Sequence, residues 1–202
     1  MRPPSARPAA YLYTLRGILW REALRFVHQR ARLAAALVRP SLWLLVFAVG
    51  FRSVLDVSDV PPYDGGISYE TYIVPGLLGM IQLFNGMQSS LSLVIDREVG
   101  SMRVLMASPM PRWYLLFCKL MGGVLVSLLQ AALFVAVATS TLVHLPPMGL
   151  LRVLPVMLLT GLMLGSIGLL LSARVRQLEN FAGVMNFVIF PLFFMSSALY
   201  PL

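Results

Sequence analysis

The chain contains four long stretches free of Asp, Glu, Lys and Arg, and these constrain its fold more than any other feature. They cover residues 71–95, 120–151, 153–173 and 180–202. An α-helix of about 20 residues crosses the roughly 30 Å hydrocarbon core of a bilayer. The composition agrees, since 58% of the 202 residues are hydrophobic and 12% are charged, whereas soluble domains carry about 25% charged residues. This excludes a soluble globular enzyme and a disordered chain, and predicts an all-α polytopic membrane protein.

Two local features raise the expected number of spans to five. Arg39 and Arg52 bracket a shorter apolar run, and arginine side chains can extend from it toward opposite interfaces. Pro146 and Pro147 interrupt the 120–151 stretch, where no helix centre tolerates them, so it divides into two spans joined by an outer turn. The expected spans are about 35–56, 71–95, 114–143, 150–173 and 180–198, in a single transmembrane domain over residues 1–202.

The distribution of basic residues predicts the orientation of these spans. The N-terminal segment, the 96–119 loop and the 174–179 loop hold 14 of the 16 Lys and Arg residues, while the two loops on the opposite side hold Arg52 and Arg152. Basic residues accumulate on the cytoplasmic side, and no signal-peptide pattern is visible at the start. The N-terminus is therefore expected in the cytoplasm. Because the charges fall between apolar runs, the net charge of +8 favours membrane orientation over nucleic-acid binding.

Residues 11–32 have the periodicity of an amphipathic helix at the membrane surface. Leu12, Leu15, Leu19, Ala23 and Phe26 fall on one helical face, and a second face holds Arg21, Arg25, His28 and Arg32. Such a helix can lie flat on an anionic membrane or pack on a cytoplasmic partner. The sequence leaves both possibilities open.

Polar and small residues within the spans predict helix–helix contacts. Gln82, Asn85 and Ser89 share one face, which indicates hydrogen bonds between helices or, as a second interpretation, the polar lining of a substrate path. Gly161 and Gly165 form a GxxxG pair that favours close packing of two helices.

The sequence predicts no catalytic residues, no cofactor and no metal site. It contains no phosphate-binding loop, no dinucleotide fingerprint and no nucleophile elbow. Cys118 is the single cysteine, and neither His28 nor His144 has a plausible ligand nearby in sequence. Asp96 and Glu98 lack a partner nucleophile. Any energy for work must therefore come from another chain.

The loop over residues 96–112 is the clearest candidate for such a contact. It starts with Asp96, Arg97 and Glu98, and Pro109 and Pro111 end it. A short amphipathic helix here would suit docking to a cytoplasmic partner, while an ordinary connection between spans explains the same residues.

Five segments together resemble the permease subunit of type-2 ATP-binding-cassette (ABC-2) exporters. They are RPSLWLL at 39–45, YIVPGLL at 72–78, DREVGSM at 96–102, ASP at 107–109, and residues 186–202. The resemblance implies an inner-membrane exporter with two permease copies, a separate ATPase subunit and an amphiphilic cargo. It implies an ATPase-coupling loop that contains Asp96, Arg97, Glu98, Gly100, Arg103, Ser108 and Pro109, and an interfacial helix that carries Arg21, Arg25 and Arg32. The family normally has six spans, so this sequence is either a fragment or encodes no sixth span.

Two other functions stay open. A membrane assembly or scaffold subunit would recruit a cytoplasmic partner without forming a path. A membrane-embedded enzyme would need polar catalytic groups near an interface, and the sequence offers no convincing set.

Overall fold

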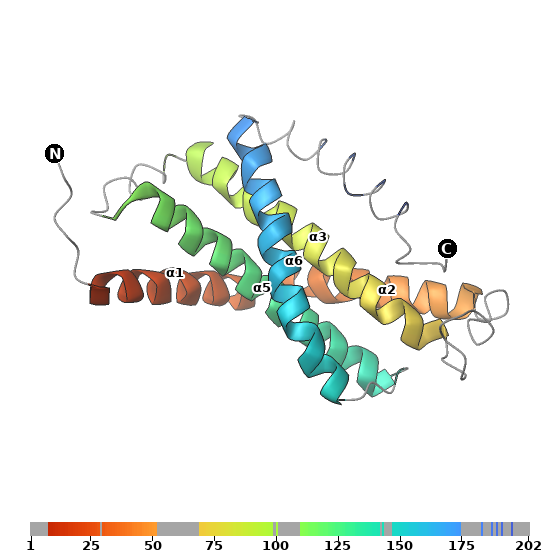
Figure 1. Cartoon of the computed structure of the whole chain (residues 1–202). Coiled ribbons are helices and arrows are strands. Elements are labelled where there is room, and N and C mark those ends of the chain that lie inside the picture. Colours follow the sequence, from red (N-terminus) through yellow and green to blue (C-terminus); the bar gives the residue numbers. More distant parts are fainter. Residues whose placement is uncertain are drawn as a thin grey trace.

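The chain forms a bundle of long α-helices (Figure 1). The computed structural model describes residues 8–28, 30–51, 69–98, 100, 110–141, 143 and 147–174, with single residues at 183, 187, 189, 191 and 195. Its helices are α1 (Pro8–His28), α2 (Arg30–Phe51), α3 (Tyr69–Glu98), α5 (Arg112–Thr141) and α6 (Pro147–Arg174). No strand occurs within these ranges, so the all-α fold class is confirmed.

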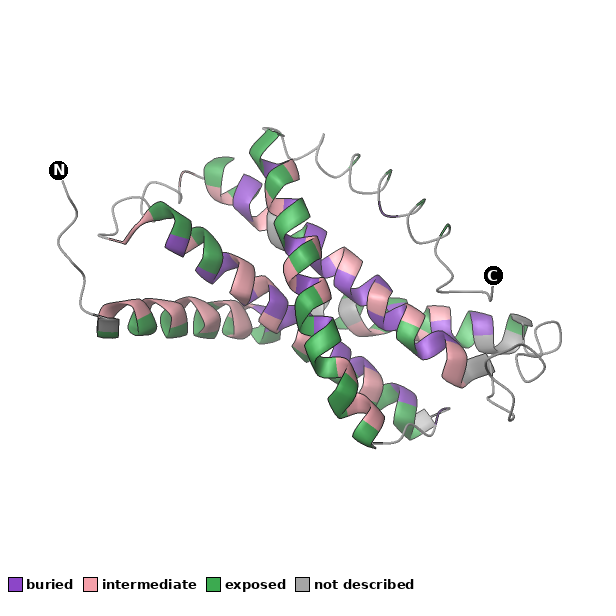
Figure 2. Cartoon of the chain, viewed as in Figure 1, coloured by how far each residue is buried: buried purple, intermediate pink, exposed green. Residues whose placement is uncertain are grey.

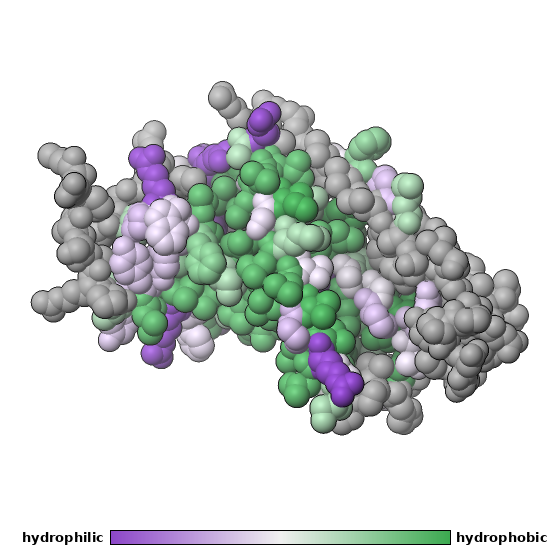
Figure 3. Space-filling view, in the orientation of Figure 1, coloured by the Kyte–Doolittle hydropathy of each residue, from purple (hydrophilic) through white to green (hydrophobic). Residues whose placement is uncertain are grey.

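Helix α3 lies at the centre of the bundle. It packs against α2, α5 and α6, while α1 packs mainly on α5. The buried apolar core draws on all four bundle helices, with Leu44 and Phe47 from α2, Leu77 from α3, Phe134 from α5 and Met157 from α6. Buried residues follow α3 and the side of α5 that faces it, whereas α6 is largely exposed (Figure 2). The exposed surface of α6 is apolar (Figure 3), as expected for a surface in contact with lipid tails.

Within the described residues, two helices are long and apolar enough to cross a membrane, judged by length and composition. These are α5 over Arg112–Ser140 and α6 over Met148–Arg174, while α2 contains a shorter apolar stretch over Leu37–Phe47. Helix α3 is 30 residues long, but amide side chains make it less apolar. Residues 180–198, the expected last span, lie mostly outside the described part of the chain. The total of five membrane spans therefore stays a prediction.

The burial of its amides explains why the central helix can be less apolar than its neighbours. Gln82 and Asn85 are only 1% and 5% exposed. A polar group costs most when it faces hydrocarbon without a partner, and these two face other helices. Helix α3 therefore needs less apolar surface than α6.

The helix ends separate into two groups, as alternating passage through a layer requires. The C-terminal ends of α3 and α6 and the N-terminal end of α5 lie toward the same end of the bundle, where α1 packs against α5 (Figure 1). The opposite ends of α3, α5 and α6 lie together with the end of α2. Helices α3 and α6 therefore run in the same general direction and α5 runs against them.

A change of helix falls at the two prolines that interrupt the long apolar stretch. Helix α5 ends at Thr141 and α6 begins at Pro147, a position that suits proline because the first helical N–H has no partner. Helices α1 and α2 together cover the amphipathic segment expected over 11–32, apart from residue 29, which lies outside the described residues, and Arg32 lies in α2. A location of this segment at the membrane surface stays a prediction.

Glycines bring α3 and α6 into close contact. A Cβ atom at Gly86 of α3 would lie 3.1 Å from the carbonyl carbon of Leu164 and 3.2 Å from the amide nitrogen of Gly165. A Cβ atom at Gly161 would lie 2.9 Å from Oε1 of Gln82. The close packing that the GxxxG pair predicts is thus confirmed, and Gly86 supplies the opposing surface.

Candidate functional site

The last turn of α3 is joined to the start of α5 by an ion pair. The Asp96 carboxylate accepts a hydrogen bond from the Lys119 ammonium. The two side chains are 15% and 7% exposed, so both are largely withdrawn from water. Breaking such a pair leaves a buried charge without its partner, and this pair therefore holds α3 and α5 together at this end.

Arg97 joins the same turn of α3 to the end of α6. Its guanidinium donates to the carbonyl oxygen of Ser172 at 3.0 Å. Helix α6 ends at Arg174, so this carbonyl is one of the last four, which have no partner within the helix. A cation there also interacts favourably with the negative end of the helix dipole.

The chain turns sharply just after α3. Gly100 has φ +77°, and its N–H donates to the carbonyl of Arg97 at 3.2 Å. Glycine adopts this left-handed conformation readily, as is common at helix C-termini. Glu98 is exposed at the last position of α3, directly before this turn.

Helix α1 is attached to the first turns of α5. The Tyr114 hydroxyl donates to the Tyr11 carbonyl at 2.6 Å, and the two rings meet edge to face with centroids 4.8 Å apart. A Cβ atom at Gly122 would lie 3.0 Å from Cγ of Glu22, so the two helices approach closely there. We call these contacts, with the two contacts made by Asp96 and Arg97, the helix-end junction.

The junction unites some of the predicted coupling residues. Asp96 and Arg97 belong to it, and Glu98 and Gly100 follow directly along the chain, whereas Arg103, Ser108 and Pro109 lie outside the described residues. Arg21 and Arg25 of α1 approach Glu22 at 3.2 and 3.7 Å. Among the described residues, no group of three or more His, Cys, Asp and Glu side chains is placed to hold a metal ion. The contacts of the junction connect α3 to α5, α3 to α6 and α1 to α5.

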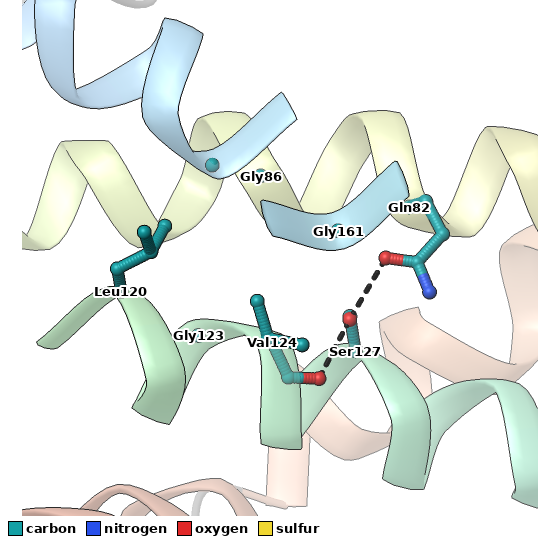
Figure 4. Close-up of a pocket in the computed structure, with 8 residues that line it drawn as sticks. Gln82, Gly86, Leu120, Gly123, Val124, Ser127 and Gly161 are labelled. Carbon is teal, nitrogen blue, oxygen red and sulfur yellow. Dashed lines mark hydrogen bonds between the residues drawn. The ribbon is translucent and has the colours of Figure 1, made fainter. Parts of the chain in front are cut away.

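A second polar group lies in the middle of the bundle, between α3 and α5. The Ser127 hydroxyl lies 2.9 Å from Gln82 Oε1 and 2.8 Å from the Val124 carbonyl (Figure 4). One turn away, the Asn85 amide donates to Gln130 Oε1. The hydrogen bonds between helices that the sequence suggested are therefore present. The Ser89 side chain lies outside the described residues, and a path lined by these residues stays a prediction.

Gln82 also borders a small space between α3, α5 and α6. Its Nε2 atom is buried and has no hydrogen-bond partner. The space measures about 10 Å³, close to the lower limit for one water molecule. Glycines at positions 86, 123, 161 and 165 line it with Leu120 and Val124 (Figure 4). This space is too small for cargo.

We expect Asn85→Leu to lower the free energy of unfolding by about 1 kcal/mol, since hydrogen bonds between membrane helices contribute roughly this much. The double variant Asn85→Leu with Gln130→Leu is expected to regain stability, because replacing both partners with apolar groups removes the desolvation cost. Titration with a denaturing detergent, followed by circular dichroism, measures both effects. Gln88→Leu, at an exposed position of α3, is the control, and a changed cargo profile without loss of stability would favour the path interpretation.

Two junction residues, Lys119 and Ser172, are not indicated by the pattern of loop charges. Lys119 falls among those charges in the sequence, although it lies two turns inside α5. A single lysine within an apolar helix needs an acidic partner, and this signal points toward Asp96. No sequence signal identifies Ser172, because its contact is made by a backbone carbonyl.

The chain matches the family model described as ABC-2 type transporter over residues 13–202. It is 30% identical over 129 residues to the probable multidrug ABC transporter permease YbhR of Escherichia coli strain K12, and equally to the protein of that name from Escherichia coli O157:H7. The alignment covers 62% of this chain, and the chain spans 35% of the length of each relative. No solved structure matches it.

Proposed function

The chain belongs to the ABC-2 type transporter family as a permease, and from that premise we propose that it is the membrane-spanning subunit of an ATP-driven exporter. It works with a separate ATPase subunit, and a second permease copy completes the substrate path. The ATPase supplies the energy, since the sequence contains no phosphate-binding loop.

The helix-end junction is the observation that carries this proposal. A partner that moves the segment after Glu98 pulls on the last turn of α3. The ion pair of Asp96 with Lys119 transfers that force to α5, and the hydrogen bond from Arg97 transfers it to α6. Coupling of this kind requires a contiguous set of physical contacts between two sites, and the junction provides one.

The proposed orientation places the junction and α1 on the cytoplasmic side of the inner membrane. The excess of basic residues in the connected segments supports it, and so does the gathering of their helix ends at one end of the bundle (Figure 1). In this orientation the segment between α3 and α5 is accessible to a cytoplasmic ATPase.

We assign an amphiphile as the cargo class. The relatives carry the name multidrug permease, and the exposed surfaces of α2 and α6 are apolar. A second copy packed on part of this surface would enclose a path with apolar walls, which suits molecules with apolar bodies.

We expect Glu98→Ala to lower cargo-stimulated ATP hydrolysis by about fivefold or more, the range of a typical coupling free energy. Glu98 adjoins the turn through which the partner acts, so its loss weakens coupling more than folding. The measurement is ATPase activity of the permease–ATPase complex in proteoliposomes, with and without an amphiphilic drug. Gln88→Ala, exposed on the same helix, is the matched control.

Unchanged stimulation in Glu98→Ala would remove Glu98 from the coupling route. If the ATPase subunit copurifies but no amphiphile changes its rate, the assembly or scaffold function replaces the exporter. Failure of the ATPase subunit to copurify at all would contradict both functions.

A further inference from the structure

Arg39 of α2 occupies an unusual position beside the centre of α3. Its guanidinium carbon lies 4.4 Å from the centre of the Phe84 ring. Phe84 is 12 residues from Asp96, about 18 Å along the helix axis. The guanidinium therefore lies beside an aromatic ring well away from the charged end of α3.

The contact with Phe84 satisfies only part of the bonding capacity of Arg39. A cation–π contact satisfies none of the hydrogen-bond donors of the guanidinium, which carries five N–H groups. Arginine stays protonated in proteins, and near the edge of the expected span (about 35–56) its charge is costly without a partner. Within the described residues, no carboxylate forms an ion pair with Arg39. The Arg39 residue is exposed. An anion from outside the chain would meet this need.

The surface next to Arg39 is apolar and continuous along one side of α2. Four of its residues are more than half exposed, namely Val38, Leu42, Leu45 and Val46. Their spacing places them on one helical face. This apolar stripe extends from Arg39 toward Phe51, away from α1. The surface thus offers a positive charge at one end and an apolar strip beyond it.

We propose that Arg39 and this stripe bind one anionic phospholipid. The headgroup phosphate accepts hydrogen bonds from the guanidinium, which suits bidentate contact with phosphate oxygens. An acyl chain lies along the stripe. A lipid fits better than a second copy of the chain, because one molecule supplies the negative charge and the apolar tail in the order that α2 presents them.

This lipid site extends beyond the proposed export function. It requires only that α2 lies in a membrane, and it does not involve the ATPase or the helix-end junction. Loss of lipid binding would therefore leave the coupling proposal intact, and loss of coupling would leave the lipid site intact.

Trp43 provides a fluorescent reporter for the test. It follows Arg39 by four residues, one turn along α2, and stacks on Phe47 with ring centroids 5.3 Å apart. Replacing the two other tryptophans, both exposed, by phenylalanine (Trp20→Phe and Trp113→Phe) leaves Trp43 as the single emitter. The protein is placed in phosphatidylcholine bilayers that contain increasing amounts of brominated phosphatidylglycerol or brominated phosphatidylcholine, which quench a nearby tryptophan.

Half-maximal quenching is expected at an about fivefold lower mole fraction of the anionic lipid than of the neutral lipid, the typical effect of one arginine near anionic lipid. Arg39→Gln is expected to abolish this preference. Arg39→Lys is expected to keep part of it, since lysine retains the charge but loses the planar donor fork. Arg16→Gln removes an exposed charge from α1 and is expected to leave the preference unchanged.

Three results would overturn the proposal. Equal quenching by both lipids in the single-tryptophan protein shows that no anionic lipid is preferred. A preference that survives Arg39→Gln places the lipid elsewhere. Failure of both lipids to quench Trp43 shows that another molecule, such as a second copy of the chain, covers this face.

Discussion

Replacing Gly86 by leucine is expected to prevent correct packing of α3 on α6 and to lower stability by about 3 kcal/mol or more, the upper range for overpacking. A single added Cβ atom would already lie 3.1 Å from the backbone of Leu164. A backbone cannot rotate away as a side chain can, so helix α6 must move as a unit. Because α3 and α6 form the most extensive helix contact in the bundle, the expected result is loss of the folded, monodisperse protein. Size-exclusion chromatography in detergent and detergent unfolding measure it.

Gly79→Leu is the matched control for this prediction. Gly79 lies on the same helix two turns away, and apart from its chain neighbours and the adjoining helix backbone nothing lies within 4 Å of its Cβ position. Gly165→Ala should cost less than Gly86→Ala, because its nearest neighbour is the flexible end of the Leu120 side chain. Equal stability of Gly86→Leu and Gly79→Leu would show that the close contact between α3 and α6 does not form.

Replacing Asp96 by alanine is expected to lower the free energy of unfolding by about 3 kcal/mol, the typical cost of removing one member of a buried ion pair. The Lys119 ammonium, 7% exposed, would lose its carboxylate inside the bundle. Unfolding in a denaturing detergent, followed by circular dichroism, measures the loss. The exchanged pair Asp96→Lys with Lys119→Asp should recover part of the stability, and failure of any recovery would contradict a direct pair.

A second double variant separates stability from coupling at this pair. Asp96→Leu with Lys119→Met replaces both charges by apolar groups, which is often neutral for stability. If the pair transmits force from α3 to α5, this variant folds but shows reduced cargo-stimulated ATP hydrolysis. Retention of full stimulation would show that the pair serves packing alone.

The sequence predicted the features that depend on the local pattern of residues. The long apolar runs predicted helices, Pro146 and Pro147 predicted the break between α5 and α6, and the pair of Gly161 and Gly165 predicted close packing. Each prediction rests on a property of neighbouring residues, namely backbone geometry or helical periodicity.

The sequence predicted only part of the candidate site. Acidic and basic residues beside an apolar run indicated the charged segment at the end of α3, but nothing in the sequence indicated which residues it contacts. Lys119 is 23 positions away from Asp96, and Ser172 is 75 positions away from Arg97. The rotation of three helices about their axes and their relative positions along the bundle bring these groups together. Neither quantity can be predicted from a short stretch of sequence.

By itself, then, the amino-acid order determined a helical membrane protein with charged ends, since the free energy of placing each residue in hydrocarbon or water depends mainly on that residue. Only the tertiary structure decided which amides and charges meet, and that Arg39 lies beside Phe84 on α3. The physical reason is that hydrogen bonds and ion pairs act over a few ångströms. Their formation therefore depends on how the helices pack.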